Sequence, residues 1–165
     1  MNGILIREMK IEDWESVKDI YQQALLEGKS TFNGVVPTYE EWDRGHLKDC
    51  RYVVEKNDKI VAWCSLSPTS SREVYRGVVE LSIYVDKNNR NKGIGKKLLK
   101  YLCEESEKKG YWTLYSAIFE INIESRKLHL SCGFREIGYR EKIAKDIFGN
   151  WQNTFIYERR SKILI

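Results

Sequence analysis

The sequence has few of the features that would divide the chain or place it in a membrane. Only two prolines, Pro37 and Pro68, occur in 165 residues, and no Ser/Gly-rich or low-complexity stretch separates one part from another. We therefore expect a single domain spanning residues 1–165. No apolar run is long enough for a signal peptide or a membrane span, which predicts a cytoplasmic protein without a membrane partner.

Cysteine pairs and charge clusters are also absent. The four cysteines form no Cys-x-x-Cys pair, which argues against a zinc site and a disulfide scaffold: Cys50, Cys64, Cys103 and Cys132. We expect no metal site. The 28 basic and 24 acidic residues are mostly interleaved, so the net charge of +4 predicts a solvated surface and no nucleic-acid partner.

Hydrophobic periodicity and turn residues predict the element order β-α-α-β-β-β-α-β-α-β-β. The expected strands are residues 4–7, 51–55, 60–67, 76–85, 111–119, 134–142 and 153–159. The expected helices are residues 11–26, 38–49, 96–109 and 123–132. Thr38 and Glu41 form a capping box at the start of the second helix. The helix before residue 111 makes the strands 76–85 and 111–119 parallel, since such crossovers are nearly always right-handed parallel units.

The most informative motif is Arg90-Asn91-Lys92-Gly93-Ile94-Gly95, between a strand and the longest helix. Its two glycines let the backbone approach a ligand, and the helix that follows adds the positive end of its dipole. Such a turn fits a diphosphate, and a solvated helix cap is the structural alternative. Lys96-Lys97 does not match a Walker turn, and Leu98 does not match a dinucleotide fingerprint, so coenzyme A is the preferred ligand.

These residues resemble the GCN5-related N-acetyltransferase superfamily, whose Arg/Gln-x-x-Gly-x-Gly/Ala signature is matched by Arg90, Gly93 and Gly95. More narrowly, the chain resembles the phosphinothricin and methionine-sulfone acetyltransferase branch. The matching stretches are residues 63–68, 75–85, 110–114, 125–129, 133–135 and 140–142. The resemblance implies an α/β (mixed α+β) fold: a twisted, mostly antiparallel mixed sheet that splays at the acetyl-CoA site, with helices on both faces.

The resemblance also implies which residues contact acetyl-CoA. The main chain of Ile83, Tyr84 and Val85 would pair with the pantetheine arm like an extra strand, while Ile83 and Val85 could be core residues as well. The diphosphate would be held by Asn91, Lys92, Gly93, Ile94, Gly95 and Lys96, with Arg90 and Lys96 adding positive charge. Asn122 matches a cofactor-binding position, and its structural alternative is a helix N-cap.

For catalysis, the resemblance points to Glu80 and His129. Acetyl transfer to an amine requires loss of a proton, and Glu80 is the candidate base because its apolar strand would raise its affinity for protons. The alternative is that Glu80 pairs with a cation such as Arg72. His129 would assist proton movement or be a packed structural residue. A main-chain N–H near Val85 would polarise the thioester oxygen.

The acceptor is expected beside Glu80. Four residues before the catalytic strand match the substrate loop of the resembled enzymes: Ser70, Ser71, Arg72 and Tyr75. Phe32, with Thr31, would close the pocket, and the other expected substrate-binding residues are Glu80, Leu81 and Ser82. Arg72 is suited to bind a carboxylate, and a solvated loop charge is its alternative.

The sequence therefore predicts direct transfer of acetyl from acetyl-CoA to the α-amino group of a small amino acid or analogue, with detoxification of such analogues among the expected roles. Acetylation of a peptide or protein N-terminus or of a polyamine, and a non-catalytic acyl-CoA-binding module, are the alternatives. The resemblance also implies a homodimer, which would use the terminal strands around residues 151–157.

Overall fold

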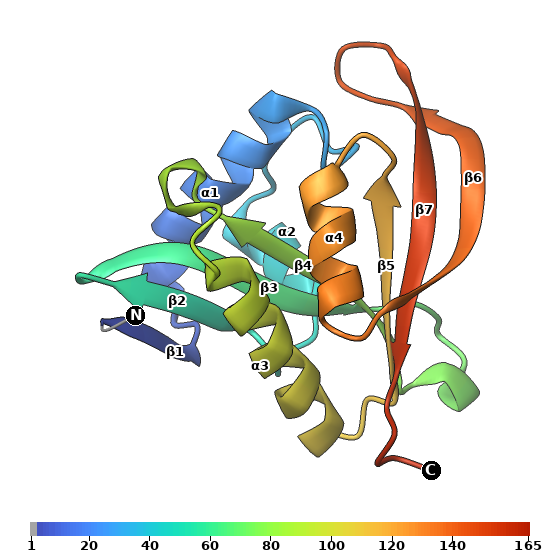
Figure 1. Cartoon of the computed structure of the whole chain (residues 1–165). Helices are drawn as coiled ribbons and strands as arrows, with labels where there is room; N and C mark the ends of the chain where they lie inside the picture. Colours follow the sequence, from blue (N-terminus) through green and yellow to red (C-terminus); the bar gives the residue numbers. More distant parts are fainter. Residues whose placement is uncertain (1–2) are drawn as a thin grey trace.

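The computed structural model describes residues 3–165 and contains one seven-stranded sheet with the order β1-β2-β3-β4-β5-β7-β6 (Figure 1). The strands are β1 (Ile4–Glu8), β2 (Tyr52–Lys56), β3 (Lys59–Pro68), β4 (Val78–Val85), β5 (Thr113–Phe119), β6 (Arg135–Lys145) and β7 (Trp151–Arg160). Neighbouring strands are antiparallel except β4 and β5, which are parallel. The helix α3 (Ile94–Lys108) connects these two, so the predicted parallel crossover is confirmed.

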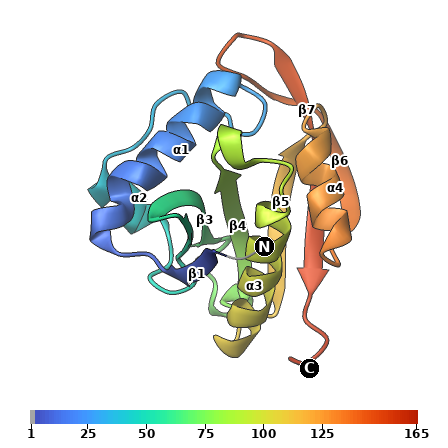
Figure 2. The same cartoon turned by 60° about the vertical axis from the view of Figure 1, so that its left-hand side comes forward.

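Helices cover both faces of the sheet, as Figures 1 and 2 show. On one face, α3 and α4 (Ile123–Ser131) lie over the centre, and the leucines of α3 join a core with residues of β2 to β5. On the other face, α1 (Trp14–Glu27) and α2 (Tyr39–Gly45) form a second, aromatic-rich core against Val53 and Trp63. The expected mixed sheet with helices on both faces is therefore confirmed. None of the helices within residues 3–165 has the length and apolar character that a membrane crossing requires.

The ends of the first two helices differ from the predictions. Residues Ile11–Asp13 form a 3₁₀ turn, and α1 starts only at Trp14. The second helix ends at Gly45, where the prediction continued to residue 49. After it, His46 is extended, and the Arg51 guanidinium binds the carbonyl oxygens of residues 43, 46 and 47. The side chain of Arg51, which follows the predicted helix, thus holds residues 46 and 47 in a non-helical conformation.

The sheet opens between β4 and β5. Only Val78–Glu80 pairs with Thr113–Tyr115. Beyond this point residues 81–85 stay paired with β3, and residues 116–119 stay paired with β7. Each strand therefore follows its outer neighbour, and the two diverge as Figure 1 shows. The predicted splay is confirmed, and it gives β4 a stretch of main chain with no strand partner on one side.

Gly77 lies at the closed end of this divergence, directly before β4. Its carbonyl oxygen accepts hydrogen bonds from the main-chain N–H groups of Trp112 and Thr113, at 2.9 and 3.1 Å. The indole of Trp112 lies so close that a Cβ added to Gly77 would approach ring atoms to 2.1–2.3 Å. The absence of a side chain at Gly77 therefore permits the contact that starts the β4–β5 pairing.

We predict that Gly77→Ala destabilises the protein by about 1–3 kcal/mol, because the added methyl group would overlap the indole of Trp112 and force a shift of the ring or of the strand. Urea unfolding measures the loss. Gly45→Ala is the matched control, since nothing lies within 4 Å of the Cβ position there. Equal stability of the two variants would contradict the role given to Gly77.

Candidate active site

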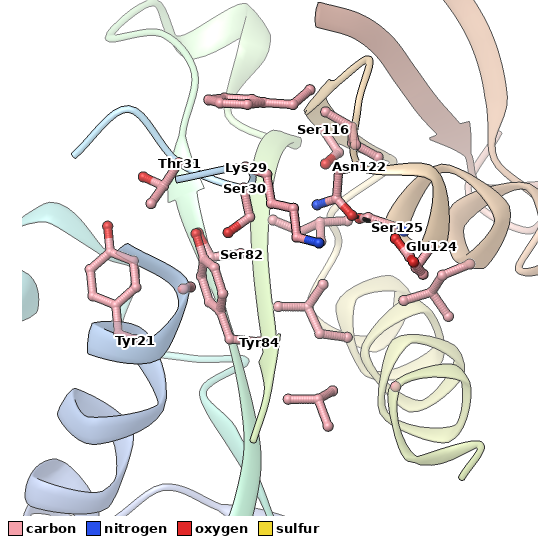
Figure 3. Close-up of a pocket in the computed structure, with 18 of the residues that line it drawn as sticks. Tyr21, Lys29, Ser30, Thr31, Ser82, Tyr84, Ser116, Asn122, Glu124 and Ser125 are labelled. Atoms are coloured by element: carbon pink, nitrogen blue, oxygen red, sulfur yellow. Dashed lines mark hydrogen bonds between the residues drawn. The ribbon is translucent and has the colours of Figure 1, made fainter. Parts of the chain in front are cut away.

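A cavity of about 800 Å³ occupies the divergence of β4 and β5. Residues from the end of α1, the loop after it, β3, β4, the turn before α3, β5 and α4 line this cavity. Figure 3 shows Ser82 and Tyr84 of β4 on one side and Asn122 and Ser125 of α4 on the other. The cavity thus joins the turn singled out in the sequence to the carboxylate of Glu80.

The turn before α3 has the geometry of an anion site. Asn91 and Gly93 have φ angles of 59° and 78°, and Gly93 is the N-cap of α3 without any side-chain cap. The first N–H groups of the 15-residue helix therefore have no partner in the helix and carry its positive dipole end. Asn91, Gly93, Gly95 and Lys96 line the cavity. A diphosphate would meet main-chain donors and a lysine there.

Two residues of the turn lie apart from the cavity. The Lys92 ammonium donates to the carbonyl oxygen of Asn88 and faces solvent. Ile94 is 2% exposed because its side chain packs in the core under α3, so only its main chain is available to a ligand. Arg90 does line the cavity, but its guanidinium is paired with Glu27, at 2.8 Å.

The free edge of β4 is available for the main-chain contacts with a ligand that the sequence predicts. Ile83 and Val85 pack against the core under α3, and Tyr84 points to the opposite face, where its ring contacts Tyr21 and Trp63. Their side chains thus contact protein, whereas the main chain of this stretch has no strand partner on the side of β5. An extended ligand with amide groups fits this edge as an additional strand.

Asn122 has the predicted cap role and also lines the cavity. Its Oδ1 accepts a hydrogen bond of 3.3 Å from the main-chain N–H of Ser125. Its amide nitrogen is not part of this bond, and the side chain faces β4 across the cavity (Figure 3). The cap is confirmed, and contact with the cofactor stays a prediction.

Glu80 lies where β4 and β5 part, opposite Ser67 of β3 and Tyr115 of β5. Solvent reaches it through the cavity, yet the surrounding protein walls desolvate it, and this burial raises the pKa of the carboxyl group. Within residues 3–165 it has no ion-pair partner: Arg72 stacks on Tyr75 instead, with 5.4 Å from Cζ to the ring centroid. The alternative Glu80–Arg72 pair is therefore not formed.

His129 is buried, at 1% exposure, against Phe134 and Tyr157. Its Nδ1 lies 2.7 Å from the carbonyl oxygen of Ser125, so Nδ1 carries the hydrogen and donates. Burial lowers the pKa of the ring to about 4. The neutral ring therefore has an unprotonated Nε2, which has no partner in the described chain. In this state His129 has no proton to give at the cavity wall, and its lowered pKa makes it a weak base near neutral pH.

The predicted acceptor residues fall into two groups. Phe32, Glu80, Leu81 and Ser82 line the cavity together with Thr31, and Phe32 packs on Phe119 of β5 with 4.4 Å between ring centroids. The second group, Ser70, Ser71, Arg72 and Tyr75, lies outside the cavity lining on the loop between β3 and β4. In that loop the Arg72 N–H donates to the Ser70 hydroxyl, and a 3₁₀ turn spans Glu73–Tyr75.

Other cavity residues were not predicted. Tyr21, Trp42, His46 and Trp63 wall the cavity on the α1 and α2 side. Their spacing in the sequence indicated only buried faces of a helix and a strand, because periodicity does not tell a core from a cavity wall. Lys29 extends from the loop after α1 into the space between β4 and α4 (Figure 3). No cluster of three His, Cys, Asp or Glu residues suitable for a metal ion occurs within residues 3–165.

Comparison with known proteins agrees with this geometry. The model of the acetyltransferase (GNAT) family matches residues 14–134. A phosphinothricin N-acetyltransferase of Streptomyces coelicolor is 29% identical, over 90% of this chain and 91% of that protein.

Two solved structures are similar over nearly the whole fold. A GNAT superfamily phosphinothricin acetyltransferase from Sinorhizobium meliloti, in complex with acetyl-CoA, superposes with a TM-score of 0.85 at 25% identity, covering 96% of this chain and 88% of that one. A ribosomal-protein-alanine N-acetyltransferase from Brucella melitensis gives a TM-score of 0.86 at 29% identity, covering 95% and 99%.

The unsatisfied amides of the turn, the free edge of β4 and the cavity between them fit acetyl-CoA, the cofactor of this family. The chain belongs to the acetyltransferase (GNAT) family and is an acetyl-CoA-dependent N-acetyltransferase.

Proposed function

We propose that this enzyme acetylates the α-amino group of a small amino acid or amino-acid analogue, with Glu80 as general base. The observation that carries this proposal is the position of Glu80, which lines the cavity where β4 and β5 part and has no ion-pair partner among residues 3–165. A raised pKa is what a base working near neutral pH requires. The same feature counts against a non-catalytic acyl-CoA-binding module, which needs no such group.

The residues of the cavity have distinct tasks in this proposal. Bound acetyl-CoA supplies an activated thioester. Glu80 takes the ammonium proton of the acceptor, directly or through one water molecule, so that a neutral amine is available for attack. A main-chain N–H near Val85 donates to the oxygen that becomes negative in the transition state. The aromatic walls formed by Tyr21, Phe32 and Trp63 limit the access of bulk water.

The acceptor class rests on the relatives and on the shape of the site. The Streptomyces coelicolor relative is named for phosphinothricin, and relatives of Pseudomonas aeruginosa and Salmonella typhimurium for L-methionine sulfoximine and L-methionine sulfone. Each of these acceptors is a small amino acid analogue. A peptide or protein N-terminus is the second candidate, which the name of the Brucella melitensis structure favours. Arg72 lies on the loop between β3 and β4, outside the cavity lining, and is the proposed partner of an acceptor carboxylate that extends beyond the cavity.

Glu80→Gln is predicted to lower kcat/KM by about 10²–10⁴-fold, because the amide cannot accept a proton. In the wild type, kcat/KM rises with pH as Glu80 ionises. Burial raises the pKa of Glu80 above that of an ordinary glutamate, so this rise occurs at a higher pH. This rise disappears in the variant. Initial rates from pH 5 to 9 measure the pH dependence of kcat/KM in both proteins. Glu73→Gln, on the exposed neighbouring loop, is the control. An unchanged pH profile in Glu80→Gln would remove Glu80 as the base.

An acceptor panel tests the substrate class. We expect CoA release with phosphinothricin, methionine sulfone or methionine sulfoximine to exceed release with peptides or polyamines. Arg72→Ala should raise the KM for the acceptor about tenfold, because one charge-assisted contact is lost. Arg44→Ala, an exposed change on α2, controls for lost charge. Preference for an alanine-terminated peptide, with no effect of Arg72→Ala, would establish the second candidate.

We also propose a homodimer, at a surface that includes Trp151 of the predicted region but lies mainly on the outer strand β6. Within residues 151–157, Tyr157 and Ile156 are buried inside the chain, because β7 lies between β5 and β6. The outer strand β6 instead exposes Ile137, Tyr139 and Ile143, and Trp151 lies opposite its end. An edge strand with this much apolar surface supports association of two copies.

Sedimentation is predicted to give twice the 19.5 kDa chain mass for the wild type. Ile143→Glu shifts it to the single-chain mass, since a charge cannot be buried unpaired in the interface. Val35→Glu, an equally drastic change at an 81% exposed residue elsewhere, stays dimeric. A monomeric wild type would rule out the dimer.

A further inference from the structure

A carboxylate lies at the edge of the proposed diphosphate site. Glu27 is the last residue of α1 and lines the cavity together with the turn that begins at Arg90. Its two carboxylate oxygens lie 2.8 and 2.9 Å from Nη1 of Arg90. An anion in this position repels a diphosphate unless its charge is neutralised, and Arg90 is the group that neutralises it.

The contacts of Arg90 hold it between two elements. Besides the pair with Glu27, its Nε donates to the carbonyl oxygen of Val85 at 3.1 Å. The guanidinium is thus fixed between the end of β4 and the end of α1. Both side chains of the pair are about one third exposed, so solvent and salt reach the pair. Nε and Nη1 of the arginine in the family signature are therefore engaged by protein groups, and these contacts set the direction of its side chain.

A separate contact keeps α1 in place next to the turn. Gln23, four residues before Glu27 and so on the same face of α1, donates to Oδ1 of Asp86 at 2.8 Å and accepts from the main-chain N–H of Lys87 at 2.9 Å. These bonds do not depend on the charge of Glu27. Neutralising Glu27 therefore leaves the helix docked and changes mainly the electrostatics of the site.

We propose that Glu27 is a positioning residue that holds Arg90 away from the diphosphate and thereby lowers the affinity for acetyl-CoA and CoA. The diphosphate is held by the main-chain N–H groups of residues 91–96 and by Lys96. Glu27 and Arg90 together contribute no net charge to the site. An affinity reduced in this way favours release of CoA after each turnover.

The Kd for CoA, measured by calorimetry at low salt, tests the proposal in a double-mutant cycle. Glu27→Gln frees Arg90 and tightens binding about threefold to tenfold, a change that shrinks in 0.5 M NaCl because the groups are solvent-accessible. Arg90→Ala leaves the Glu27 carboxylate unpaired and weakens binding by a similar factor. The double variant again has no net charge at this pair, and its Kd returns to within about twofold of the wild type.

The cycle separates this role from two others. A double variant that binds as weakly as Arg90→Ala would show that Arg90 itself holds the diphosphate, and would overturn the proposal. A lower melting temperature in Glu27→Gln without tighter binding would show a merely structural ion pair, and would also overturn it. Glu15→Gln, the same charge change on an exposed residue at the other end of α1, leaves the Kd unchanged.

Discussion

The parting of β4 from β5 is the constraint on which the rest of the site depends. Pairing stops after Glu80 and Tyr115, and each strand then follows its other neighbour. This divergence leaves one edge of β4 without a strand partner and opens the cavity. It also places a carboxylate at the point where the opening begins. A sheet with continuous β4–β5 pairing would satisfy these main-chain groups internally and leave no place for a thioester.

The divergence also divides the cavity between two faces of the sheet. On the face of α3 and α4 the turn of residues 90–95 offers main-chain donors and Lys96. On the face of α1 and α2 lie Glu80, hydroxyl groups and aromatic rings. A cofactor and an amine can therefore enter from opposite sides and meet between the strands. Direct transfer between two bound substrates needs this arrangement. A nucleophilic cysteine has no place in it, because all four cysteines are buried and none lines the cavity.

The features that local sequence determines were predictable. The glycine-containing turn, the capping box at Thr38 and the parallel crossover each depend on residues close together in the chain, and each is present. Asn91 adopts a left-handed conformation, which asparagine tolerates better than most residues. The mixed, mostly antiparallel sheet and its splay followed from the resemblance, because the alternation of polar and apolar residues does not say where two strands stop pairing.

Contacts between distant residues were not predictable in the same way. Glu27 and Arg90 are 63 positions apart, so no spacing in the sequence links them. Arg72 has the right chemistry for a carboxylate, but the loop path and its stacking on Tyr75 keep it out of the cavity lining. The protonation of His129 depends on a carbonyl oxygen one helical turn away and on complete burial. Each of these outcomes is set by packing, which composition and periodicity do not encode.

A crystal structure of the complex with CoA is the most direct measurement of the central claim. It should show the diphosphate on the main-chain N–H groups of residues 91–96, the pantetheine arm along residues 83–85, and the sulfur atom between β4 and β5 on the side of Glu80. A cofactor bound elsewhere on the molecule, or a β4–β5 pair that closes in the complex, would contradict it.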